Sequence, residues 1–245
     1  MLSFVLDGPD DAPAILYLHG LGMAGWCWDP VRADLTDFGA LVPDMPGHGG
    51  SAAMPWETLA HTADSVIDVV ETLPAGRPVY LVGQSLGAYV GWLMLGKRPD
   101  RFARAVLSGF HIGHLRWRPL YRLAYVINGS MFAVPSLLWL FSGVLGDPQA
   151  GSRFVEGAKV IRPRTIRRAG IQAVDFRSPT GLTAPPVPLL AVSGSKEPGA
   201  IRLTPNRLAA ENPNVDALVL DGRDHLWPLK EPVRYSAILR SQFKS

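Results

Sequence analysis

The residues with the clearest chemical potential lie between Val79 and Ala88, in the segment VYLVGQSLGA. An apolar run enters the pattern Gly-x-Ser-x-Gly, and a helical pattern follows it. Glycines on both sides of the serine permit a sharp strand-to-helix turn that holds the hydroxyl above the edge of a sheet. The N-terminus of the following helix favours developing negative charge. This context predicts that Ser85 is a nucleophile.

A serine hydroxyl attacks poorly unless a base accepts its proton. Six histidines are present, and His225 follows the last predicted strand, within the segment Leu220–Pro228. Loops at the carboxyl ends of parallel strands converge on one crevice, so His225 should lie at the same sheet edge as Ser85. We therefore predict that His225 is the base.

The base needs an acid that fixes its tautomer and stabilises the imidazolium. The predicted strand Val187–Val192 leads into Ser-Gly-Ser-Lys-Glu, which places Glu197 at the right edge in the chain order serine, acid, histidine. Asp221 and Asp224 are alternatives. Asp224 adjoins the histidine in sequence, however, and would have difficulty reaching its inner ring nitrogen.

Two backbone N–H groups are expected to form an oxyanion hole. The N–H of Leu86 directly follows the nucleophile, and the glycine-rich segment His19-Gly20-Leu21-Gly22 follows the predicted strand Ala14–Leu18. Glycines free that loop to aim the N–H of Leu21 into the crevice. We expect His19 to brace the loop rather than to react.

The elements that must position these residues follow from alternating apolar runs and helical patterns, which are typical of a parallel sheet covered by helices. Helices are predicted from Leu59 to Leu73, from Ser85 towards Pro99, and from Pro228 to Phe243. The fold class is therefore α/β, with a mostly parallel, doubly wound sheet. The predicted strands are Leu2–Leu6, Ala14–Leu18, Ala40–Pro43, Val79–Val82, Ala105–Ser108, Val187–Val192 and Val215–Leu220.

Composition excludes several classes of protein. The chain has 245 residues, a net charge of +3 and 47% hydrophobic residues, which is incompatible with a disordered chain. A single cysteine, Cys27, rules out an intrachain disulfide. The N-terminus has neither the basic patch nor the apolar run of a signal peptide, and no nucleic-acid motif is present. A cytoplasmic protein without a nucleic-acid partner is expected.

Residues 110–186 interrupt the strand–helix rhythm and read as an inserted helical cap, so that 1–109 and 187–245 form the core. The segment from residue 101 to residue 177 contains twelve basic residues and only three acidic ones. No charged residue occurs from Ala124 to Gly146. Polar residues, glycines and a proline interrupt that stretch, so we expect an apolar cap wall or a face that touches lipid transiently, not a stable membrane span.

The chain resembles the α/β-hydrolase superfamily in four motifs that occur in the family's order. They are Leu18–Gly22, Pro43–Gly49, Gly83–Gly87 and Asp224–Pro228. The resemblance implies an α/β-hydrolase fold with a triad of serine, histidine and acid under a cap, and no metal or organic cofactor. Two positions depart from the pattern: the acid is glutamate where aspartate is more frequent, and Asp224 stands where a glycine often precedes the histidine.

Within this superfamily, a serine at the turn between the strand and the helix disfavours dehalogenases and epoxide hydrolases, which use aspartate at that position. We predict a serine hydrolase that cleaves a small-molecule carboxylic ester through an acyl-enzyme. Alternatives are a thioesterase, a lactonase, a C–C bond hydrolase or a non-hydrolytic receptor. Two histidines three residues apart, His111 and His114, make a poor metal site.

The cap should determine the substrate. Its aromatic and aliphatic residues suggest an apolar pocket, and its arginines suggest a rim that receives an anionic or carrier-linked part of the substrate. The arginines in question are Arg116, Arg118, Arg122, Arg153, Arg162, Arg164, Arg167 and Arg168. We expect four residues to contact the substrate: Trp139, Phe110, Leu140 and Trp227.

Overall fold

In the computed structural model, which describes residues 1–132, 134, 138–139, 142–179, 182 and 185–244, seven strands form one sheet. Its order is β1-β3-β2-β4-β5-β6-β7; β1 pairs antiparallel with β3 and all other pairs are parallel. All seven predicted strands and the mostly parallel fold class are confirmed. The strands span Phe4–Asp7, Ala14–Leu18, Gly39–Pro43, Val79–Gln84, Arg104–Ser108, Leu189–Gly194 and Val215–Leu220.

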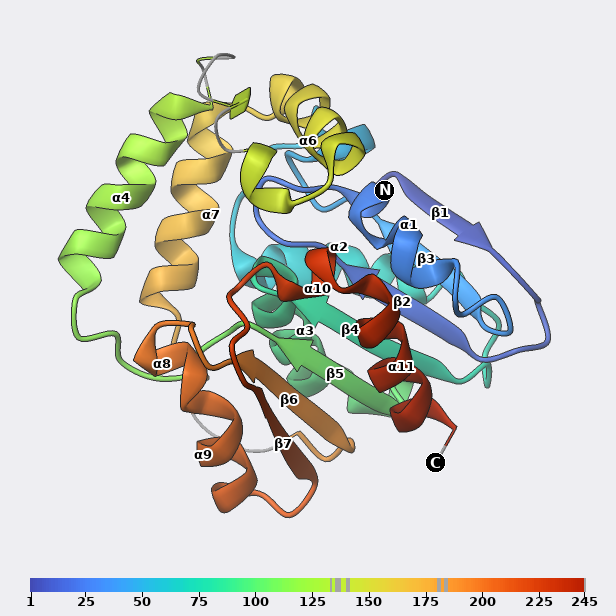
Figure 1. The fold of residues 1–245 in the computed structure, drawn as a ribbon. Coiled ribbons are helices and arrows are strands. Elements are labelled where there is room, and N and C mark those ends of the chain that lie inside the picture. The colour runs from blue at the N-terminus through green and yellow to red at the C-terminus, as the bar shows by residue number, and fades with distance from the viewer. Residues whose placement is uncertain (133, 135–137, 140–141, 180–181, 183–184, 245) are drawn as a thin grey trace.

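Both faces of the sheet are buried, because alternate residues of each strand point to opposite sides. Leu16 and Leu81 belong to one hydrophobic cluster, whereas Ile15 and Val82 belong to the other. The first cluster includes residues of α2 (Leu59–Val70), α3 (Leu86–Lys97) and α9 (Thr204–Glu211), and the second includes residues of α1 (Asp29–Arg32) and α11 (Pro232–Phe243). Figure 1 shows α1 and α11 on one side of the sheet and α2 and α3 on the other.

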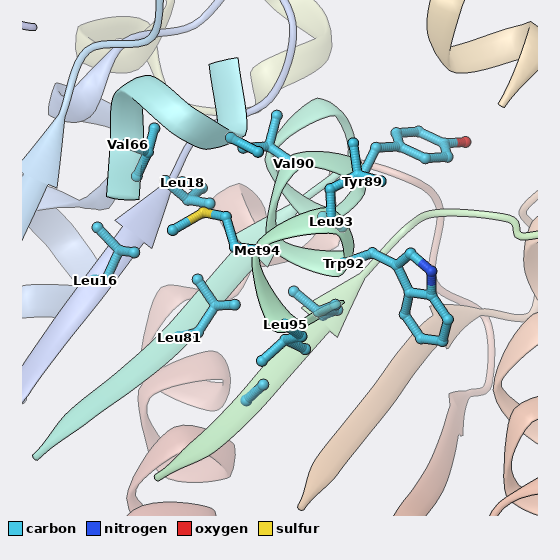
Figure 2. Packing of buried hydrophobic residues seen from close by; sticks show 14 of the residues in the cluster. Leu16, Leu18, Val66, Leu81, Tyr89, Val90, Trp92, Leu93, Met94 and Leu95 are labelled. Atoms are coloured by element: carbon cyan, nitrogen blue, oxygen red, sulfur yellow. The ribbon is translucent and has the colours of Figure 1, made fainter. Parts of the chain in front are cut away.

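Helix α3 begins directly after the predicted nucleophile and is buried along most of its length. In Figure 2 the side chains of Val90 and Met94 point toward Leu18 of β2 and Val66 of α2. Both α3 residues are fully buried. The N-terminus of this helix is therefore held firmly against the strands that carry the predicted site.

The C-terminal helix predicted as one element from Pro228 to Phe243 is two helices. Helix α10 (Trp227–Lys230) ends before Glu231, whose φ of −128° and ψ of 57° are not helical. Pro232 then begins α11. A proline disfavours helical geometry in the residue before it and cannot donate a helical hydrogen bond, which explains the break.

Between β5 and β6 the chain leaves the sheet and forms helices, the insertion that the sequence predicted. They are α4 (Arg118–Met131), a 3-10 turn at Gly143–Leu145, α6 (Pro148–Val160) and α7 (Pro163–Asp175). Helices α4 and α7 pack side by side, and Figure 1 shows α4 on the outside of this pair. Across the described ranges, no helix is both long and apolar enough to cross a bilayer. The short helix α8 (Gly199–Arg202) follows β6.

The turn after β4 leaves no room for a side chain at Gly87, because a Cβ there would overlap the carbonyl oxygen of Leu18. We expect Gly87→Ala to lower the free energy of unfolding by about 3 kcal/mol or more, since backbone would have to move. Gly143→Ala is the matched control, because no atom of the described residues lies within 4 Å of a Cβ at that position. Chemical denaturation of both variants measures the difference, and equal losses would contradict this account.

Candidate active site

Ser85 occupies a strained turn between β4 and α3. Its φ is 54°, and it is the one non-glycine residue in the described part of the chain with a positive φ. Its backbone N–H donates to the carbonyl oxygen of Ser108, at 2.8 Å, which ties the turn to β5. A Cβ at Gly83 would lie 2.7 Å from the carbonyl oxygen of Gly87, so the flanking glycines are sterically required. Strain of this kind persists where surrounding contacts over-determine the backbone, often at functional sites.

Three side chains predicted from separate loops lie in one line of hydrogen-bond contacts. The Nε2 atom of His225 is 2.8 Å from Oγ of Ser85, and its Nδ1 atom is 2.5 Å from Oε1 of Glu197. The second carboxylate oxygen of Glu197 accepts the backbone N–H of Gly194 at 2.7 Å. Glu197 is buried, with its side chain 1% exposed. A proton can therefore pass from the serine to the histidine, and the fixed carboxylate faces the other ring nitrogen.

The two alternative acids have other partners. Oδ1 of Asp221 accepts the hydroxyl of Ser195 at 3.1 Å. Asp224 accepts the backbone N–H of Leu226 and forms an ion pair with Lys230 at 2.5 Å. Partial burial tends to raise the pKa of Asp224, but these partners together hold it below its usual value. Of the three candidates, Glu197 is the one whose carboxylate contacts the histidine.

Two further residues hold the histidine loop, and sequence reasoning did not find them. Nε2 of Gln84 donates to the backbone carbonyl oxygen of His225, at 3.1 Å. Gly109, with a φ of 70°, passes so close to the imidazole that a Cβ would lie 2.9 Å from its Cε1 atom. In the sequence, Gln84 occupies the unspecified position before the serine in Gly-x-Ser-x-Gly, and Gly109 is a single glycine after β5. Neither feature specifies a contact with the histidine loop.

The loops after β2 and β4 meet at the point where the strand connections diverge to opposite sides of the sheet. Such switch points form ligand crevices. Here Gly20 and Leu21 line the same cavity as Ser85. The backbone N–H groups of Leu21 and Leu86 donate no hydrogen bond to any residue in the described ranges, so both remain free for an incoming oxygen.

Two buried histidines connect the Gly20–Gly22 loop to the loop after β3. Nε2 of His19 accepts the backbone N–H of Met45 at 3.0 Å, and Nε2 of His48 accepts that of Gly22 at 3.3 Å. Each Nδ1 atom faces a backbone carbonyl oxygen, so both rings fit a neutral state with the proton on Nδ1. Burial lowers the pKa of His19 to about 4 and that of His48, also lowered by the neighbouring His19, to about 3.

These histidines should make folding sensitive to acid. In the unfolded chain a histidine takes up a proton near pH 6.5, whereas the folded chain resists protonation of His48 to about pH 3. The unfolded state thus binds more protons, and stability falls as pH decreases from about 6.5 toward 4. His48→Gln keeps an acceptor but removes the titration, so its slope should be shallower by up to about 1.4 kcal/mol per pH unit. Urea denaturation at several pH values compares the two; parallel slopes would contradict the prediction.

Two cavities meet at Ser85 and His225. The first has a volume of about 310 Å³ and is lined mainly by apolar side chains of the insertion and of the loops. The second has a volume of about 230 Å³. Besides Ser85 and His225, the residues that line the first cavity include Met23, Tyr125, Phe132, Leu138, Leu145, Phe154 and Ile166. Those that line the second include Tyr89, His111, Leu115, Tyr121, Tyr125 and Ile201.

Three of the four residues predicted to contact substrate lie elsewhere, and for these three the prediction is corrected. Phe110 is buried in the core against Tyr89 and Trp92, and Trp227 packs against Tyr235 with 4.9 Å between ring centroids. Trp139 is 57% exposed and lines neither cavity. Leu140 lies outside the described residues.

The predicted arginine rim is also corrected. No arginine lines either cavity in the part of the chain that the structure describes. Arg118 instead pairs with Asp175 at 2.7 Å. Arg153 pairs with Asp29 at 2.8 Å and lies over the ring of Trp26. Long charged side chains of the insertion thus point to its outer surface or to neighbouring elements rather than into the pocket.

No cluster of three or more His, Cys, Asp or Glu side chains suited to a metal ion occurs within the described ranges. His111 has a different role. Its ring nitrogens lie 2.9 Å from the carbonyl oxygen of Gly113 and 3.1 Å from that of Ala173, and burial lowers its pKa. It therefore links the segment after β5 to α7.

Comparison with known families defines the class of protein. Residues 15–238 match the model of the alpha/beta hydrolase family. The chain therefore belongs to that family, and the fold expected from its motifs is confirmed.

Individual relatives cover almost the whole chain. A curated (E)-2-((N-methylformamido)methylene)succinate hydrolase of Acinetobacter baylyi is 24% identical over 235 residues, 93% of this chain and 89% of that protein. A hydrolase from Pseudomonas aeruginosa superposes with a TM-score of 0.81 at 22% identity, covering 100% of this chain and 94% of the other. The enol-lactonase from Burkholderia xenovorans gives 0.83 at 17% identity, over 100% and 96%. These structures share the fold.

Proposed function

We propose that this chain is a serine hydrolase that cleaves a neutral carboxylic ester, with Ser85 as nucleophile, His225 as base and Glu197 as acid. The observation that carries the proposal is the unbroken contact from Oγ of Ser85 through both ring nitrogens of His225 to the buried carboxylate of Glu197. Membership of the alpha/beta hydrolase family supports it.

The reaction follows from this geometry. His225 takes the proton of Ser85 as the oxygen attacks the ester carbonyl, and the free N–H groups of Leu21 and Leu86 stabilise the oxyanion. His225 then gives the proton to the departing alcohol, which leaves an acyl-enzyme on Ser85. Water enters, loses a proton to His225 and releases the carboxylic acid. Glu197 orients the ring of His225 and stabilises the imidazolium.

The cavities favour an uncharged substrate. Neither cavity is lined by an Asp, Glu, Lys or Arg of the described residues, and the sequence from Ala124 to Gly146 carries no charge. A buried carboxylate without a partner is costly. The larger and more apolar first cavity suits an acyl chain. The second, lined by Tyr89, Tyr121 and Tyr125, suits the alcohol.

The same residues would serve thioester, lactone or C–C cleavage, so assays on different substrates must distinguish these activities. We expect activity on p-nitrophenyl esters from acetate to decanoate, with kcat/KM rising until the acyl chain fills the first cavity. An ester whose acyl chain ends in a carboxylate should be hydrolysed about 100-fold more slowly than its neutral counterpart. Equal rates on the two esters would contradict the neutral substrate, and a total absence of ester hydrolysis would contradict the proposed activity.

A residue exchange tests the position of the acyl chain. Leu138 is buried in the lining of the first cavity, whereas its neighbour Trp139 is exposed. Leu138→Trp should shift the preferred chain length to shorter esters, because it fills cavity volume. Trp139→Leu is the matched control and should leave the profile unchanged. The profile of kcat/KM against chain length is the measurement, and an unchanged optimum in Leu138→Trp would place the acyl chain elsewhere.

A further inference from the structure

Helix α4 presents apolar side chains to solvent. Leu120, Leu123 and Ile127 are 63%, 55% and 53% exposed. Their spacing of three and four residues puts them on one face of the helix. Large apolar side chains gathered on one exposed face are unusual on a soluble surface and mark an interaction site.

The opposite face of α4 is the one that packs on the protein. A Cβ at Gly170 of α7 would clash with the ring of Tyr125, and one at Gly129 would lie 2.9 Å from the carbonyl oxygen of Pro163. Figure 1 shows α4 with α7 on its inner side. The apolar outer face of α4 is therefore not needed to hold the insertion together. Trp117, directly before the helix, is also 61% exposed.

Arginines are exposed on the segments next to both ends of α4. Arg116, Arg162, Arg164 and Arg167 are exposed, and no carboxylate in the described ranges lies within 4.0 Å of their charged groups. Arg116 lies over the ring of Trp117, and the backbone of Arg167 lies next to α4 at Gly129.

The acidic residues of this segment pair with other groups than these four arginines. Between residues 101 and 177 the acids are Asp147, Glu156 and Asp175. Asp147 caps α6, Glu156 pairs with Lys159, and Asp175 pairs with Arg118 and Arg122. Part of the excess positive charge is therefore carried by arginines that face solvent.

We propose that the outer face of α4, together with Trp117 and the neighbouring arginines, docks on an anionic lipid surface. Apolar side chains would enter the boundary between headgroups and acyl chains, tryptophan would lie at the interface, and the arginines would contact anionic headgroups. A second copy of this chain fits less well, because a symmetric contact would bring the two basic surfaces together.

Sedimentation with vesicles tests the docking surface. We expect the wild-type chain to bind vesicles of phosphatidylcholine and phosphatidylglycerol in equal parts, and to bind pure phosphatidylcholine at least about tenfold more weakly. Raising the salt concentration should weaken binding to the anionic vesicles. The triple variant Leu120→Ser, Leu123→Ser, Ile127→Ser should lose at least about tenfold in affinity.

The matched control replaces two apolar residues that are equally exposed elsewhere, Leu203→Ser with Val233→Ser, and should bind as the wild type does. Hydrolysis of a short soluble ester reports whether each variant is folded, since none of the five positions belongs to the proposed active site. No binding to anionic vesicles, equal binding to both lipids, or equal loss in the control would overturn the proposal. So would self-association of the wild-type chain that the α4 variant abolishes, because α4 would then be an interface between copies.

Discussion

Replacing Ser85 by alanine should reduce turnover of a p-nitrophenyl ester by about 10⁴- to 10⁶-fold. The variant keeps the cavity, so it loses the nucleophile while substrate binding is retained. Because Ser85 is held at a φ of 54°, alanine inherits the same strain and the fold should change little. Steady-state hydrolysis, with KM measured where turnover permits, is the appropriate test.

Ser195→Ala is a suitable control for this substitution. Ser195 lies in the same loop as Glu197, but its hydroxyl donates to Asp221 and accepts the N–H of Gly222, away from the cavities. Its loss should change turnover by less than about tenfold. Activity of Ser85→Ala within tenfold of the wild type would mean that another group is the nucleophile.

Replacing Glu197 by glutamine should lower kcat by about 10⁴-fold. The oxygen of the new amide would accept the N–H of Gly194, as Oε2 does now, and its NH₂ group would then face Nδ1 of His225. That arrangement forces the ring proton onto Nε2, so the histidine can no longer accept the proton of Ser85. The side chain has the same size, so the fold should be retained.

The competing acids provide the controls. Asp224→Asn and Asp221→Asn should each retain most of the activity, because their carboxylates contact Lys230 and Ser195 instead of His225. Glu197→Asp should fall between the wild type and Glu197→Gln, since it keeps the charge but shortens the reach. A larger loss in Asp224→Asn than in Glu197→Gln would assign the acid to Asp224. The pH dependence of kcat/KM for each variant completes the comparison.

The centre of the sheet was predictable from sequence because the strands there are buried on both faces. Runs such as Val79–Val82 and Leu189–Val192 are continuously apolar, and glycines or prolines lie close to their ends. The ends of elements were less predictable. The break at Glu231 depends on the single proline that follows it, and the periodic apolar pattern continues across the break.

Chain order explains why the candidate site could be predicted in outline. In a parallel sheet every strand delivers its following loop to the same edge, so Ser85, Glu197 and His225 converge whatever their separation in sequence. The direction of a side chain within a loop has no such rule. Phe110 and Trp227 adjoin site residues in sequence, yet both point into the core, where their aromatic surface is buried.

The contacts of Gln84 and His48 were not predictable from one sequence. Each depends on a hydrogen bond to a residue distant in the chain, His225 for the first and Gly22 for the second. The sequence showed that the insertion is rich in arginine, but it did not show which way the arginine side chains point. Arginines on a helix extend to water unless a buried carboxylate or a ligand holds them, and here they extend away from the cavities.

Whether Ser85 is a nucleophile activated by His225 can be tested without knowledge of the natural substrate. Diethyl p-nitrophenyl phosphate should label the protein with one diethylphosphoryl group per chain and release one equivalent of p-nitrophenol. Mass spectrometry of the digested protein should then locate the group on the peptide that contains Ser85, and His225→Ala should react far more slowly. Labelling at another residue, or undiminished labelling of Ser85→Ala, would contradict the account.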